Sequence, residues 1–503
     1  MNTSLQEKKA IVIGGGIAGL LTARVLADHF TDVLVIERDS SPEKPGARPG
    51  VPQSFHLHQI LPRGEIILQQ LFPGFLNDLK ALGAFQMQAD TRAFMSNPYG
   101  TLPFPGGEGE EKGITYSRGV LEWALRQRTQ VHPRVRFLYK HEVTGLLTNV
   151  EHTRVCGVQA RERGQVEQQI TLTADLVIEA SGRSSRLPQW LTTLGYTLPE
   201  DETVTSAIGY TSRYYKMPPH RRNIAVMVID PHPTTGHYLG GVLKAVENDA
   251  WCVCLAGAGG HYPAIDAAAF EEGLARLYNP SIAELLKDTE PLGEPRGYRL
   301  PTCTRHHYEQ MEQWPAGLLV LGDALCAFDP IYGQGMTVAA IEADTLATCL
   351  RQQQEQPRPD FERDILQRMQ EAIYPAWWRS AIEDLRWPGV THTGPQPLKG
   401  VKLLHKFFDL CIKQSTGQML QQLQNGDFDM QYMSYFLMNW LFISPRAVIN
   451  AGMLDFLLQN ETPERKQALL AELFAGYDQQ NSEAVLDDIV PHFTYDFASP
   501  FGA

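Results

Sequence analysis

The sequence predicts an α/β fold in three parts: a strand-helix-strand unit that opens the chain, an antiparallel sheet inserted into it, and a helical region that ends it. Residues 10–36 read as a buried strand, a glycine turn, a helix and a second buried strand. Between residues 204 and 256, hydrophobic and polar residues alternate in segments separated by turn residues, which predicts about four antiparallel strands. After residue 359 almost the whole chain has helical periodicity.

The remaining elements follow from local composition. Residues 40–53 hold four prolines and two glycines and therefore predict a loop. A continuous apolar strand at 317–321 precedes a helix at 335–351, so we expect the chain to return there to its first domain. The elements expected before residue 200 are strands at 10–13, 33–36 and 175–179, helices at 20–29, 61–71 and 118–129, and a β-hairpin near Arg163 and Gly164.

Composition is that of a soluble globular enzyme. The 503 residues are 43% hydrophobic and 20% charged, and the net charge of −13 without a basic cluster argues against a nucleic-acid partner. Seven scattered cysteines without Cys/His ligand spacing predict reduced thiols in a cytoplasmic protein and no metal site. The N-terminal residues do not resemble a signal peptide.

One long uncharged segment, 430–445, could be taken for a membrane span. As a helix it would reach about 24 Å, short of the roughly 30 Å hydrocarbon core. Because it is rich in methionine and aromatic residues, three interpretations stay open: helical core, the lining of a tunnel for a long hydrophobic substrate, or a shallow contact with a membrane surface.

The first glycine turn carries a dinucleotide-binding pattern. Gly14, Gly16 and Gly19 match G-x-G-x-x-G between a strand and a helix, and Glu37 ends the next strand. Glycines allow the backbone to approach a pyrophosphate, the helix N-terminus offers free N–H groups, and the acid accepts a ribose hydroxyl. The pattern predicts a Rossmann-like domain that binds FAD or NAD.

A second pattern chooses between these cofactors. In 319–324 (LVLGDA) a buried strand ends at Asp323, and 329–336 (DPIYGQGM) leads into a helix. Together with the first turn, these residues resemble the group A flavoprotein monooxygenases of the para-hydroxybenzoate hydroxylase type. The resemblance implies FAD, with Asp323 at its ribityl chain and the N–H groups of Gly335 and Met336 at the N1/C2 carbonyl edge of the ring.

Other segments match that family piece by piece. Residues 48–51 (RPGV) fall where the family passes a loop over the flavin, and Arg118 falls at a basic FAD contact. Residues 179–186 resemble the family's D-G-x-x-S-x-x-R segment, with Ser181 in place of its acid. The residues that motif and resemblance assign to the cofactor are Gly14, Gly16, Gly19, Glu37, Arg38, Arg48, Val51, Arg118, Gly182, Asp323, Pro330, Gly333, Gly335 and Met336.

The resemblance also gives the domain plan. We expect a discontinuous FAD-binding domain, a β-sheet domain that binds substrate, and a C-terminal helical region. Their expected ranges are 1–90, 113–195 and 300–355 for the first, 91–112 and 196–299 for the second, and 356–503 for the third.

Within the family, the strings at 50–64, 181–195 and 312–336 resemble epoxidases that oxidise polyene chains in polyether antibiotic pathways. Met336 and Thr337 stand where hydroxylases often have Leu-Asn, which favours alkene oxidation. The resemblance implies that a flavin C4a-hydroperoxide epoxidises or hydroxylates a small hydrophobic substrate (polyene, polyketide or terpenoid) in secondary metabolism. The co-substrate would be O₂, with electrons from NADPH, NADH or a partner flavin reductase.

Two other functions stay open at this stage: an FAD-dependent reductase or dehydrogenase acting on prenyl or other alkene chains, and a non-enzymatic flavin-binding sensor or carrier for a hydrophobic ligand. His56 and His58 lie in the segment expected near the flavin. A catalytic base is one interpretation of them, and a structural or hydrogen-bonding role is the other.

Overall fold

The computed structural model describes residues 8–103, 113–165, 168–425, 429–478 and 481–497. The chain divides into two compact units. The first contains Met1–Ala84, Tyr116–Glu202 and Cys303–Ile373, and the second contains Phe85–Thr115, Thr203–Thr302 and Tyr374–Ala503.

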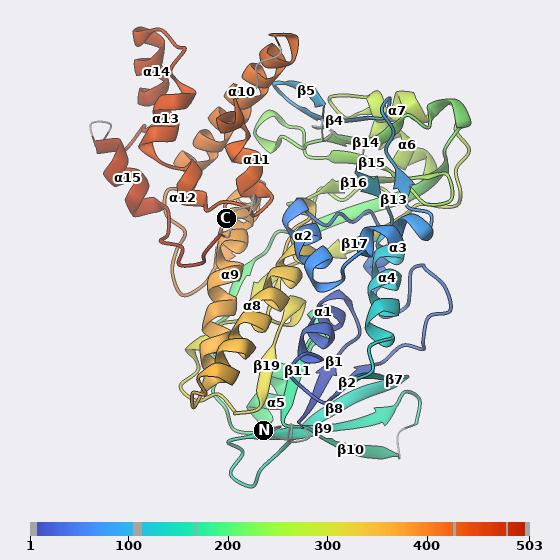
Figure 1. Ribbon diagram of the computed structural model, residues 1–503. Helices are drawn as coiled ribbons and strands as arrows, with labels where there is room; N and C mark the ends of the chain where they lie inside the picture. The colour runs from blue at the N-terminus through green and yellow to red at the C-terminus, as the bar shows by residue number, and fades with distance from the viewer. Residues whose placement is uncertain (1–7, 104–112, 166–167, 426–428, 479–480, 498–503) are drawn as a thin grey trace. The chain divides into compact units, whose positions relative to one another are not determined.

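The first unit is built on a parallel sheet of five strands in the order β19-β11-β1-β2-β7 (Figure 1). Val12, Val33 and Ile178 are fully buried, as expected of parallel strands whose two faces are both covered. The expected strand-helix-strand opening is confirmed, since β1 and β2 pair in parallel around α1. Helices α1, α4 and α8 lie side by side next to this sheet.

The elements of the first unit are β1 (Lys9–Ile13), α1 (Ile17–Leu26), β2 (Asp32–Glu37), η1 (Pro52–Phe55), α2 (Pro62–Leu71), α3 (Phe75–Ala81), α4 (Arg118–Gln130), β7 (Val135–Tyr139), β8 (His141–Thr148), β9 (Val155–Glu162), β10 (Gln169–Thr173), β11 (Leu176–Glu179), η2 (Gly182–Ser184), α5 (Leu187–Thr193), β18 (Cys303–Arg305), η5 (Tyr308–Gln310), β19 (Leu318–Val320), η6 (Gly322–Ala324), β20 (Cys326–Ala327), η7 (Pro330–Tyr332) and α8 (Gly335–Glu355). Two elements run across the limits of the units, β12 (Glu202–Val204) and α9 (Phe361–Asp384).

The second unit is built on a sheet of seven strands in the order β17-β13-β16-β15-β14-β4-β5. The four strands expected between 204 and 256 are confirmed as β13 to β16 and pair antiparallel. The sheet is larger than expected because β4, β5 and β17 join it, and β4 pairs parallel to β14. Trp251 and Phe270 are fully buried in the core between this sheet and helices α6 and α7.

The elements of the second unit are β3 (Phe85–Gln86), β4 (Arg92–Asn97), β5 (Gly100–Pro103), β6 (Ile114–Thr115), β13 (Ile208–Lys216), η3 (Pro219–Arg221), β14 (Ile224–Ile229), η4 (Pro233–Thr235), β15 (Gly240–Val246), β16 (Ala250–Gly257), α6 (Ala267–Ala275), α7 (Ser281–Leu286), β17 (Arg296–Leu300), β21 (His392–Thr393), α10 (Val401–Asn425), η8 (Met430–Met433), α11 (Ser434–Asn439), α12 (Pro445–Val448), α13 (Ala451–Leu457), α14 (Pro463–Leu473) and α15 (Ser482–Ile489).

The uncharged segment 430–445 is not one helix. It forms η8 and α11, and the chain then turns at Leu441, whose φ is 63°, before Pro445 starts α12. Tyr432, Met433 and Phe436 are buried in a hydrophobic cluster, so much of the segment is core. Within the described ranges, no helix combines the length and the apolar character that crossing a bilayer requires.

Candidate functional site

The candidate site lies at the carboxyl edge of the parallel sheet. Strands β1, β2, β11 and β19 all run in the same direction, so their carboxyl ends meet at one edge. From β1 the chain moves first to β2 on one side and later to β11 on the other. The carboxyl edge at such a change of direction is where open α/β sheets bind their ligands. Each of these four strands leads into a segment that the sequence singles out.

The three glycines after β1 have different roles in the turn. Gly14 has φ = 101°, and a Cβ there would lie 2.6 Å from the Ala180 carbonyl oxygen. A Cβ at Gly19 would lie 1.9 Å from the Gly14 carbonyl oxygen. At Gly16, with φ = −76°, a Cβ would meet only Arg48 Nη2, at 4.0 Å. Gly14 and Gly19 are therefore required by packing, whereas Gly16 leaves open space at the N-terminus of α1.

This open space is the cradle that a pyrophosphate needs. The first N–H groups of a helix have no acceptor within the helix, and they carry the positive end of its dipole. No side chain caps α1 at Gly16. The local geometry thus fits one end of FAD.

Beside the turn, Glu37 and Arg48 form the centre of a charged cluster. Glu37 is buried at the end of β2, and its Oε2 accepts the Gly15 N–H at 3.1 Å. Arg48 Nη1 lies 3.2 Å from Glu37 Oε2 and 2.7 Å from Asp39 Oδ2. Asp39 Oδ2 also accepts the Gly50 N–H at 2.7 Å, which ties the 48–51 loop to the sheet edge.

Glu122 of α4 completes the cluster. It accepts hydrogen bonds from Arg48 Nε at 2.6 Å, Arg118 Nη1 at 2.9 Å and Arg126 Nη2 at 3.2 Å. Burial alone would raise the pKa of Glu122, but the charges of these three arginines outweigh it and hold the pKa at about 2. Ser117 starts α4 by accepting the Val120 N–H at 3.3 Å. Sequence reasoning missed Glu122 and Arg126, although Glu122 lies four residues after Arg118 and four before Arg126, an i,i+4 spacing that is a usable signal.

The end of β11 supplies a buried acid, Glu179, next to the position where the family motif has its acid and this chain has Ser181. Ser181 stands at the family's acidic position, but its N–H donates to Glu179 Oε1 at 3.2 Å and its hydroxyl donates to the same oxygen. Glu179 is fully buried, and burial raises its pKa. Gly182 follows with φ = 79°. Arg38 donates to Ser184 Oγ at 3.3 Å and to the Gly50 carbonyl at 3.0 Å, so it joins two of the predicted segments.

After β19, Asp323 lies on the η6 turn. Its side chain is 33% exposed, and its Oδ2 accepts from Arg183 Nε at 3.1 Å. The preceding residue, Gly322, donates its N–H to Glu342 Oε2 of α8 at 3.0 Å. Glu342 is buried, and burial raises its pKa to about 8. The carboxyl of Glu342 therefore fixes the turn that presents Asp323, a role that the sequence does not reveal.

Helix α8 begins with open N–H groups. Asp329 caps η7 by accepting the Ile331 N–H at 2.7 Å, after which Pro330 starts the turn and Gly333 takes φ = 66°. A Cβ at Gly335 would meet nothing within 4 Å, and no side chain caps the helix. Gly335 and the half-buried Met336 thus form a second helix N-terminus that could face an anion.

The histidine segment is attached to this helix start. The Leu61 N–H donates to Thr337 Oγ1 at 2.9 Å. His56 is buried against Phe55, with ring centroids 5.7 Å apart, and His58 Nδ1 lies 3.0 Å from the His56 carbonyl oxygen. Val51 is buried, and its N–H donates to the Arg48 carbonyl at 3.0 Å. The fold thus brings the predicted flavin segments into one unit, while their roles toward the cofactor stay predictions.

Comparisons with known proteins find relatives in sequence and in fold. No family model matches the chain. Protein Rv3254 of Mycobacterium tuberculosis is 32% identical over 397 residues, which cover 77% of this chain and 82% of that protein. Squalene monooxygenase of Mus musculus is 24% identical over 344 residues, which cover 66% of this chain but only 53% of the mouse protein.

Solved structures share the fold. A flavoprotein/dehydrogenase from Cytophaga hutchinsonii aligns with a TM-score of 0.56 at 19% identity, over 79% of this chain and 88% of that one. The myxobacterial halogenase CndH, an FAD-dependent halogenase, aligns with a TM-score of 0.54 at 18% identity, over 74% and 83%. From its relatives, its fold and the motifs at its carboxyl edge, the chain belongs to the superfamily of group A FAD-dependent monooxygenases.

Proposed function

We propose that this protein uses FAD to transfer one oxygen atom of O₂ to a small hydrophobic substrate, and that epoxidation of an alkene is its preferred reaction. The observation that carries the proposal is the pair of open helix N-termini, at Gly16 and at Gly335, in the unit whose sheet edge also holds Glu37 and Asp323. Two helix N-termini in one unit, together with two carboxylates at its sheet edge, suit a long cofactor that has a pyrophosphate at one end and an acidic ring at the other.

When bound, FAD would supply the electron transfer and the activation of O₂, chemistry that side chains do not provide. The protein's own residues bind and orient it. Glu37 would accept a ribose hydroxyl and Asp323 a ribityl hydroxyl, and the N–H groups of Gly335 and Met336 would stabilise negative charge at the edge of the ring.

Several observations support an alkene as substrate. Squalene monooxygenase, a relative, is named for a polyunsaturated hydrocarbon. Oxygen transfer to an alkene needs positioning and exclusion of water rather than a side-chain nucleophile. Of the two histidines near the start of α8, His56 is buried and His58 is half-buried. A polyene, polyketide or terpenoid of secondary metabolism is the proposed substrate class.

The electrons would come from NADPH, NADH or a partner flavin reductase. Glu179, which binds the 181 turn, occupies the region that the family links with pyrophosphate recognition, and Ser181 replaces the acid there. Anaerobic reduction of the purified protein by each nicotinamide, compared with a flavin reductase, separates these sources.

The decisive experiment exploits the difference between glycines. Gly16→Ala should fold like the wild type, because its φ suits alanine and its Cβ has space, yet it should bind FAD at least about tenfold more weakly, or about 1.4 kcal/mol. Gly145→Ala, in β8 of the same unit with its Cβ 3.8 Å from the nearest atom, is the matched control and should keep FAD. Flavin retention is read from the ratio of absorbance at the flavin and protein bands.

Activity is tested with ¹⁸O₂ and a panel of polyenes. Label in an epoxide product supports the proposal. Loss of a double bond without label would mean a reductase or dehydrogenase instead. Full FAD retention by Gly16→Ala would contradict the assignment of the site itself.

A further inference from the structure

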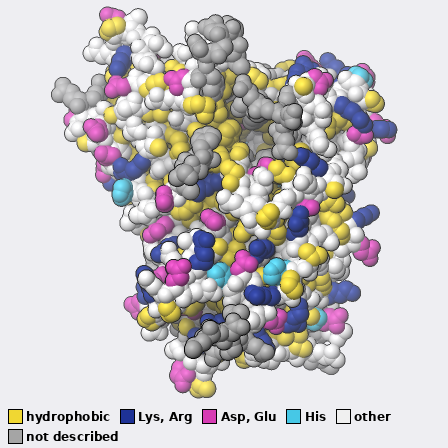
Figure 2. All heavy atoms as spheres, in the orientation of Figure 1, with side chains coloured by type: hydrophobic (Ala, Val, Ile, Leu, Met, Phe, Trp, Pro, Cys, Tyr) yellow, Lys and Arg dark blue, Asp and Glu magenta, His cyan; other side chains and the backbone are white. Residues whose placement is uncertain are grey.

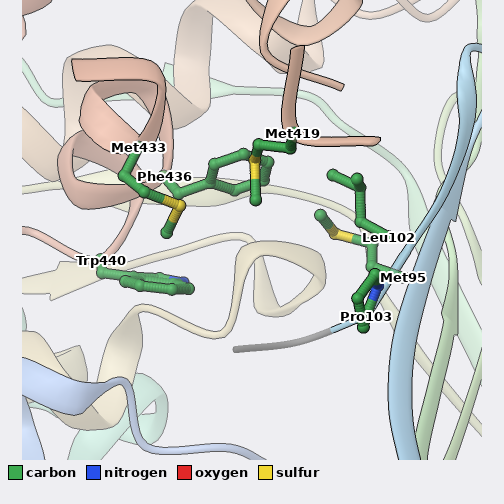
Figure 3. A pocket seen from close by; sticks show the side chains of 7 residues that line it. All are labelled: Met95, Leu102, Pro103, Met419, Met433, Phe436 and Trp440. Atoms are coloured by element: carbon green, nitrogen blue, oxygen red, sulfur yellow. The ribbon is translucent and has the colours of Figure 1, made fainter. Parts of the chain in front are cut away.

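The second unit contains an apolar pocket that no candidate-site residue lines (Figure 3). It lies between the β4–β5 hairpin on one side and α10, η8 and α11 on the other. Met95 and Leu102 of the hairpin face Met419, Met433 and Phe436 across it, and the Trp440 indole lies along its side. Residues more than 300 positions apart in the sequence therefore build one hollow.

The two walls of the pocket are attached to each other. Asn97 Nδ2, at the tip of the hairpin, donates to Thr416 Oγ1 of α10 at 2.9 Å, and both side chains are buried. Beside this bond, a Cβ at Gly100 would lie only 2.8 Å from Leu420 Cδ1, so the hairpin packs closely on α10. In the cluster that holds Met433 and Phe436, Tyr432 packs against Phe456 with ring centroids 4.6 Å apart and planes tilted by 46°. Fixed walls of this kind keep a hollow open to a ligand.

Among the residues that the structure describes, the surface of the pocket exposes no polar atom. The indole N–H of Trp440 is the one polar side-chain group of the lining residues, and it does not contribute to that surface. An occupant would gain affinity only by burying hydrocarbon, by about fourfold for each CH₂ group. Three methionine thioethers adapt to an irregular chain, and the Phe436 and Trp440 rings can pack against double bonds. Figure 2 shows hydrophobic side chains gathered on the surface over α10 and α11, next to this pocket.

We propose that this pocket binds a short unfunctionalised, unsaturated hydrocarbon segment of the substrate and selects it by the absence of polar groups. The inference rests on the proposed function for the identity of the ligand, because the hydrocarbon segment in the pocket would belong to the substrate that is oxidised. It also assigns part of the segment 430–445: Met433, Phe436 and Trp440 line a binding site, and the rest is core or connecting turn.

Binding is tested on the flavin-loaded protein with 1,6-diphenylhexatriene, an apolar polyene whose fluorescence anisotropy rises when it is held. The partly exposed Met95 and Trp440 can be changed with little risk to folding, and Met95→Gln and Trp440→Gln should each weaken binding at least about tenfold. Met430→Gln is the matched control, because Met430 begins η8 but is 50% exposed and does not line the pocket. Near-UV circular dichroism checks the fold of each variant.

Competition by n-alkanols defines the ligand class. Their affinity should rise about fourfold per CH₂ and level off once the chain exceeds the pocket, whereas α,ω-diols of equal length should compete poorly. Unchanged probe binding in both pocket variants, equal loss in Met430→Gln, or equal competition by diols would overturn the proposal. A membrane contact would replace the proposal under one result. In that result the wild type sediments with phosphatidylcholine vesicles but does not bind the probe, and Met95→Gln and Trp440→Gln abolish the sedimentation.

Turnover separates this proposal from the proposed function. A raised KM for a long polyene with an unchanged kcat in Met95→Gln supports the pocket. Labelled epoxide formed with the same KM in wild type and Met95→Gln would overturn the pocket and leave the monooxygenase assignment intact. If the protein binds the probe tightly, and the two pocket variants weaken that binding, but no ¹⁸O enters any alkene, the pocket is supported and the proposed activity is contradicted.

Discussion

Replacing Glu122 by glutamine should destabilise the first unit by about 3 kcal/mol at neutral pH. The folded pKa of this buried carboxyl is about 2, against 4.5 for an ordinary glutamate. At 1.36 kcal/mol per tenfold, that difference in pKa corresponds to about 3 kcal/mol at pH 7. Removal of one partner from a buried ion pair costs about 3–5 kcal/mol, which agrees in size.

The sign of the pH dependence follows from the direction of the shift. A carboxyl whose folded pKa is depressed stabilises the fold above its unfolded pKa and loses this contribution as the pH falls toward the folded value. The advantage of the wild type over Glu122→Gln should therefore be full at pH 7 and shrink to less than half of that value at pH 3.

Urea unfolding followed by pulsed hydrogen exchange of the α4 peptide reports on this unit alone. Glu142→Gln is the control: Glu142 pairs with Arg161 at 2.6 Å, but both side chains are about one third exposed, so its loss should cost less than about 1 kcal/mol. Two results would contradict this prediction: a loss of unfolding free energy in Glu122→Gln at pH 7 no larger than in the control, or the same loss at pH 7 and at pH 3.

Four further outcomes are expected. Glu37→Ala and Asp323→Ala should each weaken FAD binding roughly ten- to hundredfold, measured by titration of the flavin-free proteins, because each loses a charged acceptor worth about 1.5–3 kcal/mol. Gly335→Val should bind FAD poorly or lower its reduction potential, measured by dye-linked titration, because its side chain would enter the space at the start of α8. Wild-type stability should fall between pH 5 and pH 8, since burial raises the pKa of Glu342 to about 8 and ionising it opposes folding; Glu342→Gln should make that decline smaller in thermal melts. His56→Ala and His58→Ala should keep most oxygen-transfer activity in ¹⁸O assays; a loss approaching 10²- to 10⁴-fold with FAD bound would indicate a base-assisted hydroxylation.

Local patterns made much of the fold predictable. The apolar runs around Gly14–Gly19 predicted β1, α1 and β2, and alternation predicted about four antiparallel strands, which are β13 to β16. The sequence did not predict that β4 would pair in parallel with β14, because that pairing joins residues about 130 positions apart and depends on tertiary packing. Nor did it predict the turn at Leu441 within 430–445, because no composition signal announces a positive φ at a leucine.

The candidate site was predictable where a backbone requirement forces one residue type. Gly14 and Gly19 are imposed by contacts shorter than a Cβ allows, so they appear as a motif. Glu122 and Glu342 are different. A carboxylate can accept hydrogen bonds from a distant arginine or backbone N–H group from many positions on a helix, so no single position is forced. Their partners, Arg48 and Gly322, lie 74 and 20 positions away.

The charged cluster around the glycine turn also bears on how the protein is made in the cell. Arg48, Arg118 and Arg126 each have a buried acid beside them, Glu37, Asp39 or Glu122, and the mostly exposed Arg163 lies 3.6 Å from Asp39. Because each buried arginine already has a negative partner, the cluster does not need a diphosphate to relieve repulsion among the arginines. We therefore expect the chain to fold without its proposed flavin and to bind it afterwards. Yellow colour in a preparation would report cofactor loading rather than correct folding.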